Sequence, residues 1–549
     1  MAQWWSILAG AAVGVAACSG FASAQMPTGG CPILAPGRTV ISPKELRSHN
    51  GVLQVNLAFR SGVDSNGQTR YCYVAANGEL APTLRLNPGD LLILKLRNEV
   101  AAGVEQSHRN VASPDCGAEM MMSGATNLHF HGLAIPPVCH EDDSLRTLIA
   151  PSSKEFEYRF RIPATQPPGL YWYHPHPHGH SEEQVLGGAS GALIVDGREL
   201  AGKNLPERVF VIRDQKLPAA ITAIKDAARP AKNLSINFVP VPYPDYPTAV
   251  IKTQPATREL WRVVNASADT YLDLFVLFGG KFQKLGLVAL DGAPIAYGSK
   301  SERVVWSNDI SIPPGGRAEF IFVSPSEGEK AQLLTAGVDT APVGGEDNPA
   351  VVAAAGGTVP DDDDYTPPRP LAQIVASKDV VEPDIEKGRV VKRNSLPSLA
   401  TVQPVRQRKL YFSEKAMDPK HPATSTVFYL TEEGKVPAPF DPAVMTPNIT
   451  VHVGDVEDWT IENRSQESHD FHIHQTHFLV LERDGKPADG YLRDTVDVPF
   501  WDGVSAQYPS VKLRMDFRDP NIVGTFPYHC HILQHADGGM MGLIRVEPR

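Results

Sequence analysis

The apolar positions of this chain recur with the period of strands, not of helices. Phe156 to Ile162 alternates apolar and charged side chains (FEYRFRI), the two-residue period of a strand with one face on a core. Ala192 to Val195 and Arg317 to Val323 are short runs of strand-forming residues that follow turn formers. No long segment carries a helical period. We therefore predict an all-β chain of short strands.

A unit made of a turn and an apolar strand recurs along the chain. One copy runs from Asn87 to Asn98 (NPGDLLILKLRN) and another from Val453 to Asn463 (VGDVEDWTIEN), with equal spacing from the glycine to the final asparagine. The middle of the chain offers Leu260 to Asn265 (LWRVVN), which matches the end of the unit. Such a repeat indicates related domains, and we predict three Greek-key β-sandwiches. Their predicted limits are 31–197, 206–377 and 405–549, with a linker at 378–404.

Composition agrees with a multidomain protein rich in turns. The chain has 549 residues, too many for one core, and its 48 prolines and 45 glycines favour short strands joined by loops. The net charge is −11 with no dense basic run, which argues against nucleic acid as a partner. Asp361 to Asp364 could together hold a divalent cation, but we interpret this run as a solvated loop.

The N-terminus predicts export. Trp4 to Ala17 is apolar, and Ala22-Ser23-Ala24 resembles a cleavage site, although no Lys or Arg precedes the apolar run. We assign residues 1–24 as a signal peptide. Val15 to Cys18 resembles a bacterial lipoprotein motif, so a lipid anchor at Cys18 is the alternative. No later segment is long and apolar enough to be transmembrane, and we expect a periplasmic or otherwise secreted protein.

Histidines gather in four clusters near the two ends of the chain. No histidine occurs between His180 and His421. On a strand, both rings of a His-x-His pair point to one face, so both can meet one metal site. Imidazoles flanking a thiolate suit copper. The clusters are His129-Phe-His131, His174-Pro-His176, His469-Asp-Phe-His472-Ile-His474, and His529-Cys530-His531 followed by His535.

These four segments resemble the copper motifs of the multicopper oxidases, the family that includes laccases, bilirubin oxidases and copper-exporting oxidases. The motifs stand in the family's order with every ligand position filled. The resemblance implies three cupredoxin domains and an oxidoreductase with one type 1, one type 2 and two type 3 copper ions. It also implies one-electron oxidation of a reductant coupled to four-electron reduction of dioxygen to water.

The resemblance further assigns the metal-binding residues by position. Because both terminal domains contribute, the cluster of type 2 and type 3 copper is expected at their interface. Met541 is a rival for the axial position of the type 1 site, and four further histidines stand beside the motifs without matching a ligand position: His140, His178, His180 and His477. The assigned ligands are His469, Cys530, His535 and Met540 for type 1; His129 and His472 for type 2; and His131, His174, His176, His474, His529 and His531 for type 3.

Four cysteines remain for disulfide bonds once Cys18 and Cys530 are set aside. An even number of cysteines in an exported protein favours disulfides, and three pairings are possible. Pairing Cys116 with Cys139 is attractive because it would brace the segment that holds the first histidine pair. The four are Cys31, Cys72, Cys116 and Cys139.

Oxygen reduction consumes protons, so catalytic acids are expected near the cluster. Family members carry an aspartate shortly after the first motif, where we choose Asp142 over Asp143. Many members also carry a carboxylate in or just after the last motif. Here Leu533 and Ala536 occupy those places, which leaves Asp537 as the nearest acid.

Together these features predict a monomeric, laccase-like oxidase whose partners are dioxygen and a small-molecule or metal-ion reductant. The alternatives are a metallo-oxidase for Cu(I), Fe(II) or Mn(II), a bilirubin-oxidase-like enzyme, and a copper-binding or structural cupredoxin-repeat protein. Loss of copper would show as broken ligand positions, and none is broken. Met120 to Met122 is the only methionine cluster and is interpreted as packing, which favours organic reductants such as phenols.

Overall fold

The computed structural model places most of the chain, and several of the sequence predictions fall outside the part it describes. The predicted signal peptide with Cys18, the run Asp361 to Asp364 and the side chains of Met120 to Met122 lie outside the described residues. None of the helices in the described ranges has the length and apolarity needed to cross a membrane. The described residues are 30–101, 106–109, 116, 120–122, 124–152, 155–197, 201–202, 204–222, 229–295, 303–341, 365–380, 398–418 and 425–549.

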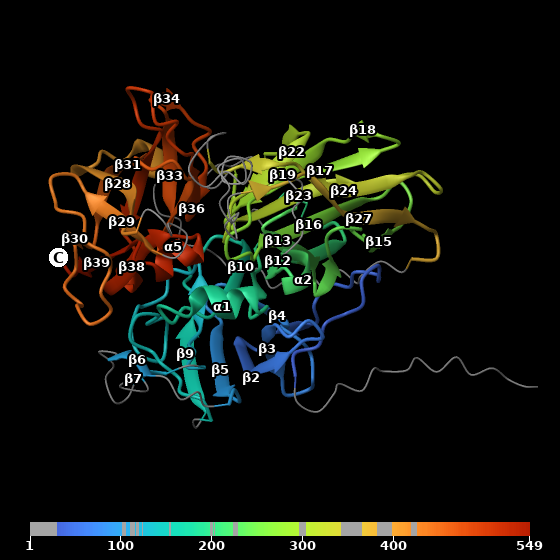
Figure 1. The fold of residues 1–549 in the computed structure, drawn as a ribbon, viewed down its shortest axis with the longest axis horizontal. Coiled ribbons are helices and arrows are strands. Elements are labelled where there is room, and N and C mark those ends of the chain that lie inside the picture. Colours follow the sequence, from blue (N-terminus) through green and yellow to red (C-terminus); the bar gives the residue numbers. More distant parts are fainter. Residues whose placement is uncertain are drawn as a thin grey trace, which may run out of the picture.

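Three β-sandwiches of the cupredoxin type make up the molecule, which confirms the predicted all-β fold. In Figure 1 the first lies at the bottom in blue to teal, the second at the upper right in green to yellow, and the third at the upper left in orange to red. The exact domain limits given above stay predictions.

The first sandwich packs a four-stranded sheet on a five-stranded one around a core that includes Phe59, Leu94 and Phe130. A separate two-stranded sheet joins β6 (Gln106–Arg109) and β7 (Met120–Met122). The four-stranded sheet has the order β3 (Thr69–Ala75), β2 (Val52–Val63), β5 (Leu91–Asn98), β9 (Phe156–Arg161); the five-stranded sheet has the order β1 (Glu45–Arg47), β4 (Thr83–Leu86), β11 (Gly191–Val195), β10 (Gly169–His174), β8 (His129–His131).

The second sandwich is the largest, with an eight-stranded and a six-stranded sheet around Trp261, Leu274 and Phe320. Its eight-stranded sheet runs β14 (Val239–Val241), β13 (Lys232–Ile236), β12 (Glu207–Lys216), β16 (Arg258–Asn265), β23 (Arg317–Val323), β19 (Leu285–Leu290), β20 (Ala293–Pro294), with β21 (Val305–Ser307) also on β19. Its six-stranded sheet runs β15 (Ala249–Thr253), β27 (Arg369–Ala376), β24 (Ala331–Thr335), β17 (Leu272–Phe278), β18 (Lys281–Phe282), with β22 (Asp309–Ile312) also on β17; β25 (Val338–Asp339) and β26 (Tyr365–Thr366) pair separately.

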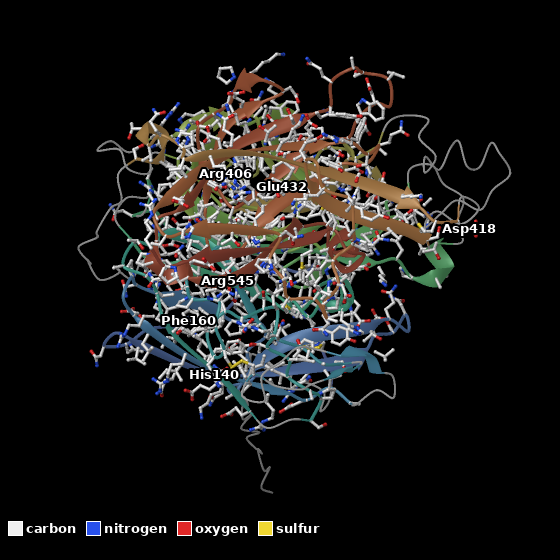
Figure 2. All side chains as sticks on the ribbon, turned by 90° about the vertical axis from the view of Figure 1, so that its left-hand side faces the viewer. His140, Phe160, Arg406, Asp418, Glu432 and Arg545 are labelled. Carbon is white, nitrogen blue, oxygen red and sulfur yellow. A yellow bond between two sulfur atoms is a disulfide. The ribbon has the colours of Figure 1, made fainter. Side chains whose placement is uncertain are left out.

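The third sandwich packs a seven-stranded sheet on a five-stranded one around Trp459, Phe471 and Leu513. Figure 2 views the molecule from this side, with Arg406 and Arg545 of the third sandwich above Phe160 of the first. The seven-stranded sheet runs β29 (Thr426–Glu432), β28 (Arg406–Ala416), β31 (Asp455–Asn463), β37 (Ser510–Phe517), β33 (Phe478–Arg483), β34 (Lys486–Pro487), with β35 (Leu492–Arg493) also on β33; the five-stranded sheet runs β30 (Ile449–His452), β39 (Met541–Glu547), β38 (Gly524–Cys530), β32 (His469–Ile473), β36 (Thr495–Val498).

The repeated unit found in the sequence is a central strand of each sandwich. β5, β16 and β31 each pair in parallel with the long strand before them and antiparallel with the next strand of their sheet. The asparagine that ends each strand is fully buried, and its side-chain amide donates to at least two backbone carbonyls of the adjoining loops. A buried amide needs such hydrogen-bond partners. The equivalent residues Asn98, Asn265 and Asn463 therefore play the same structural role in the three domains.

Short segments join the sandwiches at the centre of the molecule. α1 (Ser181–Leu186) and α5 (Leu533–Asp537) lie beside each other there (Figure 1). Val185 of the first domain, Ala268 of the second and Leu533 of the third share one buried apolar cluster. A larger apolar contact places β10 and β11 against β12 and β16. The domains therefore meet through packed surfaces, which fixes how the histidine clusters face each other.

Two disulfides are formed in the first domain. Of the three possible pairings the structure has the one that joins Cys116 to Cys139, and the second bridge is Cys31–Cys72. Figure 2 shows a disulfide in yellow beside His140. The Cys116–Cys139 bridge holds the loop between the first histidine pair and β9, and that loop carries Asp142.

Candidate metal centre

The histidine motifs lie on neighbouring strands of two sheets. In the first domain β8 pairs with β10, so that His174 lies opposite His129. In the third domain β32 pairs with β38, and His472 lies opposite His529. Because each His-x-His pair projects to one face, the two sheets present their imidazoles toward each other across the domain interface.

Eight imidazoles converge at this interface in groups whose ligand atoms lie within 4.8 Å of one another. Each group mixes the first and third domains, so neither domain alone could form one. All eight side chains are buried. The groups are His131, His174 and His531; His176, His474 and His529; and His129, His131 and His472.

Four of these imidazoles place Nδ1 within 3.0 Å of an oxygen outside the cluster. His174 Nδ1 lies 3.0 Å from the Pro175 carbonyl, His472 Nδ1 2.8 Å from that of Asp494, and His529 Nδ1 2.7 Å from that of Cys530. His129 Nδ1 lies 3.0 Å from Asp142 Oδ2. A carbonyl only accepts, so the hydrogen-bond network assigns the proton to Nδ1 and leaves a lone pair on Nε2.

The remaining ring nitrogens meet each other where hydrogen bonds cannot satisfy them all. His529 Nε2 lies 3.2 Å from both His176 Nε2 and His474 Nε2. The Nε2 atoms of His129, His174 and His472 are buried without a partner. Burial lowers the pKa of His529 well below its usual value and that of His176 to about 4, so these rings are neutral. Buried, neutral, converging lone pairs fit a metal cation.

A second group contains the one free cysteine of the described chain. His469, Cys530 and His535 are buried and place their ligand atoms within 4.8 Å of one another. Cys530 Sγ lies 3.8 Å from His469 Nδ1 and 3.7 Å from His535 Nδ1. The backbone N–H of Asp470 donates to this sulfur at 3.4 Å. A thiol with two imidazoles is a copper-binding set.

The outer nitrogens of this group are held by polar side chains. His469 Nε2 lies 2.7 Å from Ser465 Oγ, and His535 Nε2 lies 2.7 Å from Glu467 Oε1. Both ring orientations are thereby fixed, with Nδ1 directed at the cysteine. Such outer partners orient the ligands of a metal site.

The two candidate axial methionines lie on different sides of the last motif. Met540 is fully buried, accepts the Cys530 N–H at 3.0 Å and donates its own N–H to the His535 carbonyl at 2.8 Å. Met541 pairs with His529 across β38 and β39 and lines a cavity of about 20 Å³ beside His176. Met540 therefore belongs with the cysteine group, while its axial role stays a prediction.

Asp142, the first predicted acid, lies against the cluster. Its carboxylate is buried, faces His129 Nδ1 and accepts the backbone N–H of Phe130 at 3.0 Å and the Gln475 amide at 2.6 Å. Burial raises the pKa of Asp142 well above its usual value, against these hydrogen bonds. Its rival Asp143 instead pairs with Arg146 at 2.8 Å. The proton-donor role of Asp142 stays a prediction.

Asp537, the second predicted acid, lies at the end of α5 and contacts the first domain. Its carboxylate accepts the backbone N–H groups of Gly179 at 2.8 Å and Glu182 at 3.0 Å, at the start of α1. Burial raises the pKa of Asp537 to about 7. Both oxygens therefore tie the last motif to α1, and a role in proton transfer stays a prediction.

The four histidines without a matching ligand position are absent from the candidate metal groups of the described residues. His477 Nε2 lies 2.9 Å from the Asp291 carbonyl, His180 pairs with Glu183 at 3.2 Å, and His140 lies 2.7 Å from the Glu157 carbonyl. The His178 ring contacts Phe440 beside the small cavity.

Two residues that the sequence analysis did not single out complete the cluster. Asp494 Oδ1 lies 3.1 Å from His131 Nε2, and its carboxylate accepts two hydrogen bonds from Arg317 of the second domain, at 2.6 and 2.5 Å. Burial would raise the pKa of Asp494, but the Arg317 guanidinium outweighs it and lowers that pKa. The charged carboxylate thus accepts a hydrogen bond from the Nε2–H of His131 and leaves Nδ1, which has no hydrogen-bond partner, for the metal group.

Two glycines allow the second domain to approach the cluster closely. A Cβ on Gly315 would lie 2.5 Å from the His531 ring, and one on Gly132 would lie 2.5 Å from Asp494 Oδ2. Both glycines have positive φ, which favours glycine. The second domain holds no histidine, so the histidine motifs gave no indication that it contacts the cluster. The sequence signal for this contact is the Gly-Gly-Arg segment that ends in Arg317, at the start of the predicted strand.

Family models support a copper enzyme at both ends of the chain. Two models, each described as multicopper oxidase, match residues 120–200 and 409–549. These matches contain all the histidine groups described above. The family uses copper, and the neutral imidazoles and the thiol described here are ligands that suit it.

Full-length relatives point the same way. The chain is 25% identical over 525 residues to the multicopper oxidase mco of Staphylococcus aureus, covering 92% of this chain and 91% of that one. It is 24% identical to a laccase of Bacillus subtilis, covering 76% and 78%. A solved multicopper oxidase of Campylobacter jejuni, described as a metallo-oxidase, shares the fold with a TM-score of 0.65 at 24% identity, covering 93% and 96%. This chain belongs to the multicopper oxidase family.

Proposed function

We propose that the protein is a laccase-like oxidase in which His469, Cys530 and His535, with Met540 as axial ligand, hold the type 1 copper. The eight converging imidazoles hold the other three ions of the family's set. Type 2 copper is assigned to His129 and His472, and the type 3 pair to His131, His174, His176, His474, His529 and His531. The supporting observation is that the buried donors form one thiol-containing group and a separate, overlapping set of imidazole groups.

Copper bound at these two places supplies a one-electron acceptor at the thiol group and a store of electrons for dioxygen at the imidazole cluster. The chain joins the two places directly. Cys530 belongs to the thiol group, and the residues on either side of it, His529 and His531, belong to the cluster. Electrons therefore have a short path through covalent bonds, and burial of both places excludes bulk water.

The chain's own carboxylates orient the ligands and supply candidate proton donors. Asp142 holds Nδ1 of His129, and Asp494 holds Nε2 of His131. Dioxygen reduction to water consumes protons, and Asp142 is a buried acid whose carboxylate directly contacts a proposed type 2 ligand. We assign the proton-donor role to Asp142, with Asp537 serving chiefly to hold α1 against α5.

The reductant class is the second part of the proposal. We favour phenols, as expected from the absence of a methionine-rich loop in the sequence. A metallo-oxidase is the second candidate because Glu467, whose side chain is 19% exposed, contacts His535. A partly exposed carboxylate at a type 1 ligand could bind a cation such as Fe(II). The two disulfides support the predicted export to an oxidising compartment.

Oxygen consumption by the copper-loaded protein tests both parts. We expect uptake with guaiacol, and uptake at least several-fold slower with Fe(II) or Mn(II) at equal concentration. Faster uptake with Fe(II), abolished by Glu467→Gln, would favour the metallo-oxidase. No uptake with any of these donors would contradict the oxidase assignment.

A further inference from the structure

An open pocket of about 940 Å³ lies on the third domain between the end of β31 and the loop that leads into β37. Its size is within the range of small-molecule sites. Its wall combines aromatic rings with charged side chains. Its lining includes Phe500, Trp501, Tyr508, Arg464, Lys409 and Glu462.

The aromatic wall is fixed in place by hydrogen bonds within its own loop. The rings of Trp501 and Tyr508 lie 5.2 Å apart at 65°. The Trp501 indole N–H donates to the Ser505 carbonyl at 2.9 Å, and Asp502 accepts hydrogen bonds from Ser505. Tyr508 is 37% exposed. The two rings therefore present preorganised aromatic surface to the pocket, on which a third ring can stack.

Three of the charged side chains that line the pocket are paired with one another. Glu462 accepts hydrogen bonds from Arg464 at 2.8 Å and pairs with Lys409 at 2.6 Å. The Asp484 carboxylate accepts the Ser510 N–H at 2.9 Å. No unpaired cation for an anion is offered among these residues, and the Asp484 and Asp502 carboxylates are occupied by hydrogen bonds from Ser510 and Ser505. The pocket is therefore suited to a neutral aromatic molecule.

Backbone contacts connect this pocket to a proposed type 1 ligand. The Trp501 N–H donates to the Ser465 carbonyl at 2.8 Å, and the Ser465 hydroxyl lies 2.7 Å from His469 Nε2. The Phe500 N–H donates to Ser468 Oγ at 3.1 Å, next to His469 in sequence. The pocket wall is thus one residue removed from the His469 ring.

We infer that this pocket binds the ring of a phenolic electron donor and that electrons enter the protein at His469. The inference rests on the proposed function. Each phenol loses one electron, which passes through the Ser465–His469 contact to the type 1 centre as oxidant, and one hydroxyl proton, which passes to water in the open pocket. The product is a neutral phenoxyl radical. Donor specificity is then set by Trp501 and Tyr508 and not by the Glu467 side of the type 1 group.

The first test measures binding without turnover. Veratrole keeps the methoxylated ring of guaiacol but has no phenolic hydrogen. We expect ligand-observed NMR to show veratrole binding to the copper-loaded protein, with the Kd raised roughly three- to ten-fold by Trp501→Ala. Trp501→Phe, which retains a ring, should bind nearly as the unaltered protein does. Trp306→Ala is the matched control, because Trp306 is 44% exposed on β21 of the second domain.

The second test separates binding from electron transfer. Trp501→Ala and Tyr508→Ala should raise KM for guaiacol roughly three- to ten-fold with kcat little changed. The ratio of kcat/KM for guaiacol to that for ferrocyanide should fall by a similar factor, since ferrocyanide needs no aromatic wall. Trp306→Ala should leave both donors unaffected.

Unchanged veratrole binding and unchanged guaiacol KM in Trp501→Ala and Tyr508→Ala would overturn the inference. A rise in guaiacol KM in Glu467→Gln alone would also overturn it and place the donor at His535. Both outcomes differ from failure of the proposed function, in which the unaltered protein would oxidise neither guaiacol nor ferrocyanide.

Discussion

The second and third domains have the same architecture but opposite parts in the metal centre. The strand order β15-β27-β24-β17 with β22 on β17 in the second domain corresponds to β30-β39-β38-β32-β36 in the third. Both domains close the loop after the central strand with an asparagine, Asn265 or Asn463, and the sixth residue after it is Tyr271 or His469. At this position the second domain therefore has a tyrosine where the third has a proposed type 1 ligand.

The second domain nevertheless reaches the centre through its surface. Tyr271 donates its hydroxyl to Asp470, which adjoins His469, at 2.7 Å. Arg317 binds Asp494, and Gly315 packs on His531. A domain without ligands thus orients the ligands of its neighbours. The shared fold does not determine this division of roles; a few side chains at the domain surfaces do.

The largest difference between the two domains is Cys530, because the second domain has no cysteine. Cys530→Ser should abolish both the blue colour and the turnover, because charge transfer from the thiolate and the path to the cluster are lost. The imidazole cluster should retain most of its copper. Absorption spectra and metal analysis check this, and a blue, active variant would refute the type 1 assignment.

The first domain is tested at His131 and the third at His529, which lie in different proposed type 3 groups. Either substitution by alanine should block oxygen reduction while the type 1 copper still accepts an electron. Stopped-flow mixing with guaiacol should then bleach the blue band, with no return of colour in air. Full steady-state oxygen consumption by either variant would contradict the assignment.

The second domain is tested at Arg317. Arg317→Met leaves the buried Asp494 carboxylate without its cation, which should cost roughly 3–5 kcal/mol of stability and weaken copper binding roughly 10–100-fold. Copper release to a chelator and thermal unfolding measure the two effects. Arg545→Met is the control, because that side chain is 54% exposed. Copper binding by Arg317→Met equal to that of the unaltered protein would show that the second domain only packs against the centre.

The ion pairs of Glu207 with Arg85 and Arg262, where the first and second domains meet, predict that stability depends on pH. Burial would raise the pKa of Glu207, but Arg262 and Arg85 outweigh it and lower that pKa below its usual range. A carboxyl with a lowered pKa adds stability above its unfolded pKa of about 4.3, and this stability is lost as the pH falls. Glu207→Gln should therefore lower the free energy of unfolding by roughly 3 kcal/mol at pH 7. The accompanying fall in Tm should be much larger at pH 7 than in acid.

The control for Glu207 is Glu99→Gln, at a more exposed pair with Arg60. It should change Tm little at any pH. If Glu207→Gln lowered Tm equally at neutral and acid pH, the charge of Glu207 would contribute no stability at neutral pH.

The smallest expected effect separates Met540 from Met541. A thioether stabilises Cu(II), so Met540→Leu should keep the blue colour and raise the type 1 potential. Met541, which lines the cavity beside His176, should leave the potential nearly unchanged when replaced by leucine. A redox titration of both variants decides the matter. The reverse result would place the axial ligand at Met541.

Local sequence patterns predicted the strands and the grouping of the proposed ligands. They did not predict the contacts between domains. β23 begins at Arg317 and ends at Val323, as its apolar run predicts. The His-x-His pairs carry their own geometry, since both rings share one face of a strand. Asp494 acts on His131 from 363 positions away and depends on Arg317 in a third segment. No periodicity relates such residues.

Asp537 shows the same limit for a residue that motif position did single out. Its place after the last motif suggested a proton donor, but its carboxylate accepts the N–H groups of Gly179 and Glu182 in another domain. Those contacts depend on how α1 meets α5, which is set by packing of three domains around Leu533. Sequence position located the acid, and only the assembled domains gave its partners.

The most direct test of the central claim is the combined absorption and EPR spectrum of the oxidised, copper-loaded protein. We predict a blue thiolate band, one EPR signal from the type 1 site, a second from the type 2 site, and further copper by metal analysis that is silent in EPR because the type 3 pair is coupled. Copper-loaded protein without a blue band, or with all its copper visible by EPR, would contradict the assembly of one thiol site and one shared cluster between the terminal domains.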